Sequence, residues 1–130
     1  MADYLFTYGT LRLNQSHPIA NFLADTTNLV GLAELPNAKL YHIDWYPALI
    51  KTTNKNDIVI GDVVQLKTEK AWPIIDEYEG IGVGNPPYEY RREKVIVRIE
   101  NKEIQCWVYF YNIPLPQNAT EITSGDFLNP

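Results

Sequence analysis

The sequence predicts an α+β domain in which short strands form a small, curled, mixed β-barrel flanked by short helices. Strands are expected to dominate because most apolar and β-branched residues fall in short runs bounded by turn residues. Only two stretches show helical features, one after residue 16 and one over residues 70–80. A sheet covered by so few helices is expected to close on itself. The runs expected to form strands are residues 4–8, 29–35, 38–43, 58–66, 90–99 and 104–111.

The size and composition are those of a single domain, expected to span residues 1–130. The chain is 45% apolar and 21% charged, ordinary values for a globular protein. No apolar run approaches the roughly 20 residues of a membrane span, and no basic leader is visible. The single cysteine, Cys106, cannot form an internal disulfide. We therefore expect a cytoplasmic protein that does not associate with membranes.

The charge distribution argues against a nucleic-acid partner. The net charge is −5 at pH 7, whereas binding to a phosphate backbone draws on clustered Lys and Arg. The one basic cluster, within residues 91–98, is interrupted by Glu93.

The first strand, residues 4–8, leads directly into a glycine turn. Gly9 lacks a Cβ, so we expect it to permit an unusual backbone conformation and the close approach of a ligand. The N–H groups of Thr10 and Leu11 would then be available as an anion-binding concavity or oxyanion hole. The alternative interpretation is an ordinary corner between a strand and a loop.

Ser16 is expected to cap a short helix with Pro18 in its first turn, ended by the polar residues 25–28. The strand 29–35 contains Gly31, and residues 36–37 form the turn that leads into the strand 38–43.

Pro47 restricts residues 45–50 to a sheet edge or to a loop packed on the core. The polar residues 51–57 are expected to form a hairpin loop or an exposed turn. Gly61 marks a bulge or a close backbone approach in the strand 58–66.

The helix over residues 70–80 is expected to bury a stripe of apolar residues at positions i, i+3, i+4 and i+7. Pro73 fits its first turn, and Gly80 fits the position just after its end. Residues 81–87 contain two glycines and two prolines and form a loop, which could act as a lid. The buried stripe is expected to comprise Ala71, Ile74, Ile75 and Tyr78.

The strands 90–99 and 104–111 form a hairpin joined at residues 100–103. Beyond the hairpin, Ile122 and Phe127 are costly to leave in water, so the tail should be tied to the core.

Glu79 is the strongest catalytic candidate. The end of the helix and the neighbouring Asp76 both disfavour a charged carboxylate there. Such a group suits a residue that accepts a proton and returns it at neutral pH. The alternative is a solvated glutamate at a helix end.

Six segments, distributed in order over nearly the whole chain, together resemble the gamma-glutamylcyclotransferase-like superfamily. Two departures are Ile75 where the family usually has leucine and Phe127 where it often has tryptophan. The segments are Tyr8-Gly9-Thr10-Leu11-Arg12, Tyr46-Pro47-Ala48-Leu49, Gly61-Asp62-Val63, Ile75-Asp76-Glu77-Tyr78-Glu79-Gly80, Tyr90-Arg91-Arg92 and Ser124-Gly125-Asp126-Phe127.

This resemblance implies a β-barrel enzyme that releases 5-oxoproline from a gamma-glutamyl substrate. Glu79 would be the acid/base, and the turn formed by Tyr8, Gly9, Thr10 and Leu11 would hold the gamma-glutamyl group. We expect Tyr90 and Arg92 to line the pocket, the alternatives being a barrel tyrosine and a solvated arginine. Because the attack is intramolecular, positioning and one acid/base suffice, so we expect no cofactor and no metal.

Two other function classes stay open. One is a non-catalytic module that binds a small acidic metabolite in the same cavity, although a buried Glu79 would be of little use there. The other is an interaction protein that uses exposed Tyr and Trp side chains. The identity of the leaving amine and the choice between monomer and dimer are also open.

Neither histidine nor cysteine suggests further chemistry. His17 and His42 are too few and too far apart for a metal site, although Asp44 stands near His42. We expect Cys106 to be a small buried apolar residue and not a nucleophile.

Overall fold

The computed structural model describes residues 3–9, 26–43, 46–78 and 86–128. This part of the chain contains a short 3₁₀ helix, η1 (Glu69–Ala71), which leads directly into the α-helix α2 (Trp72–Tyr78). The strands are β1 (Tyr4–Thr7), β2 (Thr27–Pro36), β3 (Ala38–Ile43), β4 (Tyr46–Lys51), β5 (Ile58–Leu66), β6 (Tyr90–Ile99), β7 (Lys102–Tyr111) and β8 (Thr120–Glu121).

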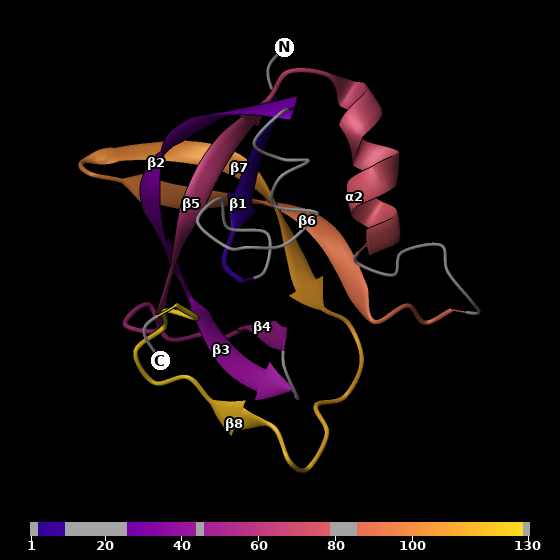
Figure 1. The fold of residues 1–130 in the computed structure, drawn as a ribbon. Helices are drawn as coiled ribbons and strands as arrows, with labels where there is room; N and C mark the ends of the chain where they lie inside the picture. The colour runs from indigo at the N-terminus through magenta and orange to yellow at the C-terminus, as the bar shows by residue number, and fades with distance from the viewer. Residues whose placement is uncertain (1–2, 10–25, 44–45, 79–85, 129–130) are drawn as a thin grey trace.

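Five of these strands form a closed barrel in the order β1-β5-β2-β6-β7 (Figure 1). The barrel is mixed because β1 and β7 run parallel, whereas the other neighbours are antiparallel. Two of its seams are short. β1 meets β7 at the pair Leu5–Trp107, and β2 meets β6 at the pair Glu34–Arg98. The predicted small mixed barrel is therefore confirmed.

A second sheet, with strand order β4-β3-β8, extends from one end of the barrel (Figure 1). The chain enters it from β2 through the predicted turn, where Asn37 has a positive φ of 60°. Pro47 lies in β4, at the edge of this sheet, where its missing N–H interrupts no ladder. The sheet-edge interpretation of residues 45–50 is thus correct for the described residues of that range.

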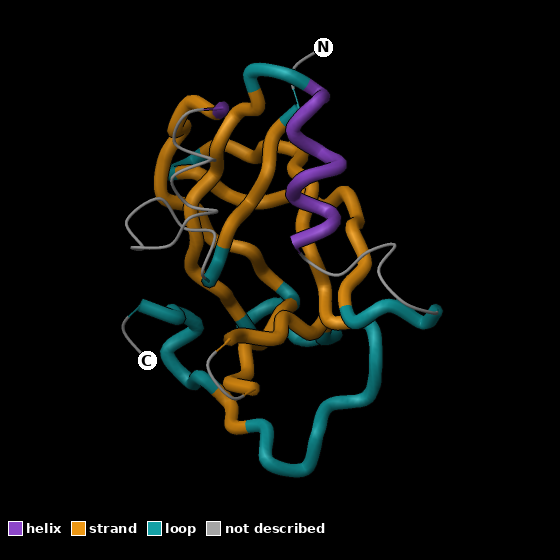
Figure 2. The backbone as a smooth tube through the Cα atoms, turned by 45° about the vertical axis from the view of Figure 1, so that its right-hand side comes forward, coloured by secondary structure: helices purple, strands orange, loops and turns teal. Residues whose placement is uncertain are grey.

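Alternating side chains separate the core into two clusters, one on each side of the barrel wall. Thus Leu5 and Phe6, neighbours in β1, belong to different clusters. The outer cluster includes Trp72 and Ile75 of α2, which packs along the barrel (Figures 1 and 2). The inner cluster contains Phe6, Tyr8, Ala33, Leu35, Ala38, Leu40, Leu49, Val59, Val63, Val97, Cys106, Val108, Phe110 and Ile122.

Most element predictions hold, and two need correction. Ile74 is 48% exposed and not part of the buried stripe, because the helical segment contacts the barrel along the narrower line of Ala71, the last residue of η1, and Ile75 of α2. The turn of the last hairpin is shorter than residues 100–103, since β7 already begins at Lys102.

Gly61 marks a close approach, as predicted. A Cβ there would lie 2.6 Å from the Phe6 ring and closer still to the Thr7 carbonyl oxygen. The register shift lies elsewhere, between Leu29 and Gly31 of β2.

The tail is tied down, as predicted. Ile122 is buried, and its N–H donates to the Leu40 carbonyl oxygen over 2.7 Å. The Gly125 carbonyl oxygen accepts from the Ile60 N–H, also over 2.7 Å. The helix expected after Ser16, the position of Gly80 and most of the loop 81–87 lie outside the described residues. No helix in the described ranges has the length and apolar character needed to cross a bilayer.

Candidate active site

Tyr8 follows directly after β1 and is one of the residues that the family resemblance assigns to substrate binding. Its side chain is buried in the inner cluster, and its hydroxyl donates to the backbone carbonyl oxygen of Tyr109. This bond ties Tyr8, the residue before Gly9, to β7, so the chain at the end of β1 is held by a second barrel strand.

Gly9 packs directly against Pro47 of β4. A Cβ at position 9 would lie 3.0 Å from Pro47 Cδ and closer still to Pro47 Cγ. Gly9 is not among the described glycines with positive φ, which are Gly31 and Gly125, so the observed reason for glycine at position 9 is its missing Cβ. Glycine is required here by the proline ring, which joins two segments that the sequence resemblance had singled out separately.

Tyr90 also contacts Pro47. Its hydroxyl donates to the Pro47 carbonyl oxygen over 2.6 Å, and its ring packs edge-on against Tyr111 with centroids 5.5 Å apart. Tyr90 is buried. Gly9, Pro47 and Tyr90 therefore form one junction, which we call the Pro47 junction, from three segments distant in sequence.

Arg92 lies on the same strand as Tyr90, two residues further along β6. Its Nη2 is 3.6 Å from Asp76 Oδ2, and its guanidinium stands over the rings of Trp72 and Trp107 at 4.1 and 5.0 Å. Among the described residues, the buried Arg92 Nη1 has no hydrogen-bond acceptor. The alternative of a freely solvated arginine does not hold, because the side chain is largely enclosed.

The other predicted site residues, Glu79, Thr10 and Leu11, lie outside the described residues. Glu79 follows directly after Tyr78, the last residue of α2, and Thr10 follows directly after Gly9. The expected opposition of Glu79 and the turn amides stays a prediction.

The sequence did not predict that Pro47, Tyr109 and Tyr111 belong to the site. Alternation along β7 was the available signal, because it places Trp107, Tyr109 and Tyr111 on one face. Burial, together with the charge of Glu89, raises the pKa of Tyr111 above its usual value. Tyr111 is therefore a neutral hydrogen-bonding group across the physiological pH range.

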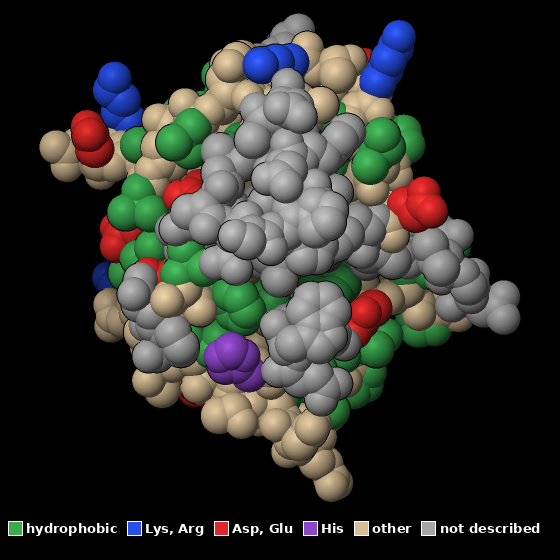
Figure 3. Space-filling model, viewed as in Figure 1, with side chains coloured by type: hydrophobic (Ala, Val, Ile, Leu, Met, Phe, Trp, Pro, Cys, Tyr) green, Lys and Arg blue, Asp and Glu red, His purple; other side chains and the backbone are tan. Residues whose placement is uncertain are grey.

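Nucleophilic and metal chemistry receive no support from the described residues. Burial raises the pKa of the Cys106 thiol to about 12, and the side chain belongs to the inner cluster, as predicted. No group of three or more His, Cys, Asp or Glu within the described ranges could hold a metal ion. On the face shown in Figure 3, the visible Lys and Arg side chains stand apart from one another and form no basic patch.

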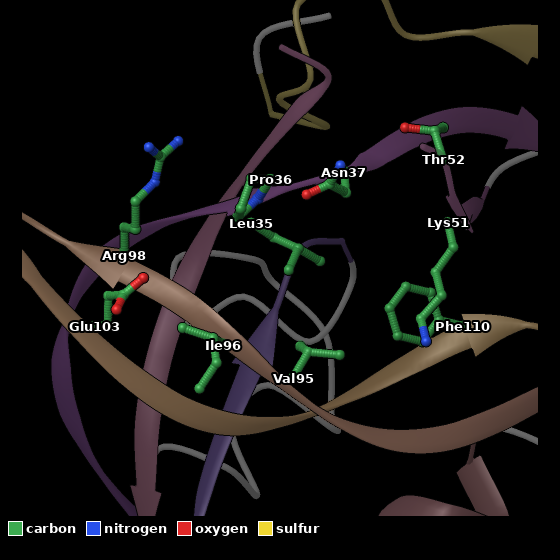
Figure 4. Close-up of a pocket in the computed structure, with 10 residues that line it drawn as sticks. All are labelled: Leu35, Pro36, Asn37, Lys51, Thr52, Val95, Ile96, Arg98, Glu103 and Phe110. Atoms are coloured by element: carbon green, nitrogen blue, oxygen red, sulfur yellow. The ribbon is translucent and has the colours of Figure 1, made fainter. Parts of the chain in front are cut away.

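A separate groove of about 380 Å³ opens where β2 and β6 diverge (Figure 4). Leu35, Val95 and Phe110 supply apolar walls, and Lys51 and Arg98 stand toward its two ends. None of the described site residues lines this groove, so it is distinct from the Pro47 junction.

Comparison with solved structures gives the fold. The chain resembles the crystal structure of an AIG2-like protein from Mus musculus, with a TM-score of 0.71 and 21% identity over 89% of this chain and 81% of that one. It also resembles an uncharacterized protein from Pyrococcus horikoshii, with a TM-score of 0.68 and 22% identity over 96% and 89% of the two chains.

Comparison of sequences gives the family. The chain is 29% identical over 130 residues to a Methanocaldococcus jannaschii protein named "Putative gamma-glutamylcyclotransferase", covering 96% of this chain and 95% of that protein. Residues 5–129 match the family described as "Gamma-glutamyl cyclotransferase, AIG2-like". By this match over nearly its whole length, the chain belongs to the gamma-glutamyl cyclotransferase, AIG2-like family.

Proposed function

We propose that this protein is a gamma-glutamyl cyclotransferase that converts a gamma-glutamyl compound into 5-oxoproline and a free amine or amino acid. Family membership supports the reaction class. The structural observation that supports the proposal is the Pro47 junction. It brings Gly9 and Tyr90 together, and these residues stand in two of the segments on which the resemblance rests.

In the proposed reaction, the substrate's α-amine nitrogen attacks its own γ-carbonyl carbon. A new C–N bond closes the five-membered lactam, and the bond between that carbon and the leaving nitrogen breaks. Glu79 takes the proton from the attacking nitrogen and gives it to the leaving nitrogen, so no water or external acid is consumed. Folding back the substrate brings the two reacting groups together at high effective molarity.

The remaining site residues bind and orient the substrate in this proposal. The backbone of Gly9, Thr10 and Leu11 faces the substrate carboxylate or the developing oxyanion. Tyr8 and Tyr90 hold the walls rigid through their buried hydroxyl bonds. The buried Arg92 Nη1, which has no acceptor within the described chain, is the kind of donor that a substrate carboxylate would satisfy.

Burial of the aromatic residues disfavours the interaction-protein hypothesis. Among the described residues, Tyr8, Trp72, Tyr90, Tyr109 and Tyr111 are all buried. Their rings serve the core and the site walls and are not displayed for a protein partner.

The test is a screen of gamma-glutamyl amino acids, gamma-glutamyl peptides and gamma-glutamyl amines for release of 5-oxoproline. We expect turnover of at least one of these classes, and the preferred class identifies the leaving group. Saturable binding of these compounds without release of 5-oxoproline would instead establish the non-catalytic binding module.

A further inference from the structure

A three-residue cluster fastens α2 to the barrel wall. Asp76 projects from α2 toward Tyr109 of β7 and Arg92 of β6, which are direct partners across the β6–β7 ladder. The Tyr109 hydroxyl donates to Asp76 Oδ1 over 2.5 Å, and Arg92 Nη2 lies 3.6 Å from Asp76 Oδ2. Each oxygen of the Asp76 carboxylate is thus engaged by a different strand.

This cluster is largely shielded from water. The side chains of Asp76 and Arg92 are 22% and 26% exposed, and Tyr109 is 1% exposed. Trp72 and Trp107, whose rings meet edge-on at 6.2 Å, supply the surface on which the guanidinium rests. The hydrogen bond from Tyr109 to the Asp76 carboxylate is charge-assisted and, in these surroundings, strong and geometrically specific, so it fixes the position of Asp76 on the barrel wall.

The direction of α2 along the barrel determines what the anchored Asp76 positions. Trp72, at the start of the helix, packs on Trp107, and Asp76 reaches the Arg92–Tyr109 pair. The next pair on the same face of the hairpin is Tyr90–Tyr111, whose Tyr90 reaches Pro47. The contacts of successive residues of α2 therefore run along the barrel wall toward the Pro47 junction. Figure 1 shows α2 lying beside β6.

We propose that Asp76 is a positioning residue. Through Tyr109 and Arg92 it sets where α2 ends relative to the Pro47 junction, and so where the chain delivers Glu79, three residues later. This inference rests on the proposed function, because it assumes that Glu79 is the acid/base. Asp76 itself need not touch the substrate. Its negative charge is matched by Arg92, so its main effect is geometric.

The kinetic test compares Asp76→Ala with Asp76→Asn. A displacement of about 1 Å at a reacting group costs on the order of 100-fold in rate, so we expect kcat of Asp76→Ala to fall about 10- to 100-fold with KM nearly unchanged. Asp76→Asn keeps an oxygen that can accept from Tyr109 and should recover much of the loss. Glu77→Gln is the matched control, because Glu77 is the neighbouring residue on α2 and is exposed.

A double-mutant cycle tests whether Asp76 acts through Tyr109. If it does, Asp76→Ala combined with Tyr109→Phe should be no slower than the slower single variant. Losses that multiply, or an Asp76→Asn variant as slow as Asp76→Ala, would refute action through this bond.

Amide hydrogen exchange of residues 75–78 gives a readout that needs no substrate. Asp76→Ala should lose protection at these positions, whereas Glu77→Gln should keep it. An Asp76→Ala variant with wild-type kcat and wild-type protection would overturn the positioning role alone. A different pair of results would overturn the proposed function and leave the anchoring role of Asp76 intact. In that case the wild-type protein releases no 5-oxoproline from any compound, and the Asp76→Ala variant still loses amide protection at residues 75–78.

Discussion

Pro47 shows how a single residue can hold a site together without chemical reactivity. It lacks an N–H and so leaves no unpaired donor in the edge strand β4, while its carbonyl oxygen accepts from Tyr90. Its rigid ring occupies the space that any side chain at position 9 would need. Glycine at position 9 is therefore needed because proline stands at position 47.

Gly9→Ala should be destabilising for this reason. Adding a methyl group to a packed contact typically costs about 1–3 kcal/mol. In a Pro47→Ala background the two close ring atoms are gone, and the remaining Cβ lies 3.7 Å away, an ordinary contact. Urea denaturation of the four proteins in this cycle should therefore show a smaller cost of Gly9→Ala in the Pro47→Ala background. An equal cost in both backgrounds would mean that the ring is not responsible.

Glu79→Gln tests the assigned acid/base. The amide keeps the shape of the side chain but cannot accept a proton at neutral pH, so 5-oxoproline release should fall by about 10²–10⁴-fold. Binding of the substrate, measured by calorimetry, should persist. Glu77→Gln is the control and should retain nearly full turnover. Similar turnover in the two variants would remove Glu79 from the mechanism.

At the level of elements, the strand bounds could be predicted because alternation and turn residues are local signals. The observed β3 and β5 coincide with the predicted strands 38–43 and 58–66. The two-residue strand β8 shows no periodicity and could not be predicted in this way. The predicted burial of Ile74 is wrong because the seven-residue helix α2 buries a narrower stripe than apolar spacing at i, i+3, i+4 and i+7 predicts.

The site was predictable only in part. Gly9 and Tyr90 stand in recognisable segments, but their common partner Pro47 is distant from both in sequence, and only the fold brings them together. The sequence indicates Asp76 only through its charge near Glu79. Its bonds to Tyr109 and Arg92 depend on the packing of α2 against two strands, which no local pattern specifies.

The end of β4 is joined to β6 by a pH-dependent interaction. Lys51 Nζ lies 3.1 Å from Glu93 Oε1, and Arg91 Nη2 lies 2.9 Å from Glu93 Oε2. Partial burial opposes ionisation of Glu93, but the hydrogen bond from Lys51 and the charge of Arg91 outweigh it and lower its pKa. A lowered pKa in the folded state contributes stability above the unfolded value, about 4.3, that is lost as the pH falls.

Glu93→Gln should therefore reduce the free energy of unfolding at pH 7, by less than about 1 kcal/mol because the group is part-exposed. The difference from wild type should shrink as the pH falls below about 4. Urea denaturation at pH 7 and at about pH 3.5 measures both values. A constant difference at the two pH values would show that the charge of Glu93 contributes nothing.

At the scale of the molecule, the tail joins the two sheets. Ile122 bonds to Leu40 of β3, whereas Gly125 bonds to Ile60 of β5. At Gly125, with a φ of 70°, a side chain would also collide with the Ile58 carbonyl oxygen. The segment therefore fits closely between the three-stranded sheet and the barrel.

Ile122→Ala should destabilise the whole protein, since Ile122 is 4% exposed within the inner cluster. The expected cost is about 2–5 kcal/mol, from lost burial and the cavity left behind. Thermal or urea unfolding measures it, with Thr123→Ala at the exposed neighbour as the control. A cost below that of the control would mean that the tail is not part of the cooperative core.

The place of β1 in the barrel has a consequence for synthesis on the ribosome. β1 precedes the other strands in the chain, yet its neighbours are β5 and β7, and β7 ends only at Tyr111. At about 5–20 residues per second, the first strand waits on the order of 5–20 s for its second neighbour. The turn at Gly9 therefore acquires its final surroundings late, and a nascent chain is expected to be inactive until translation is nearly complete.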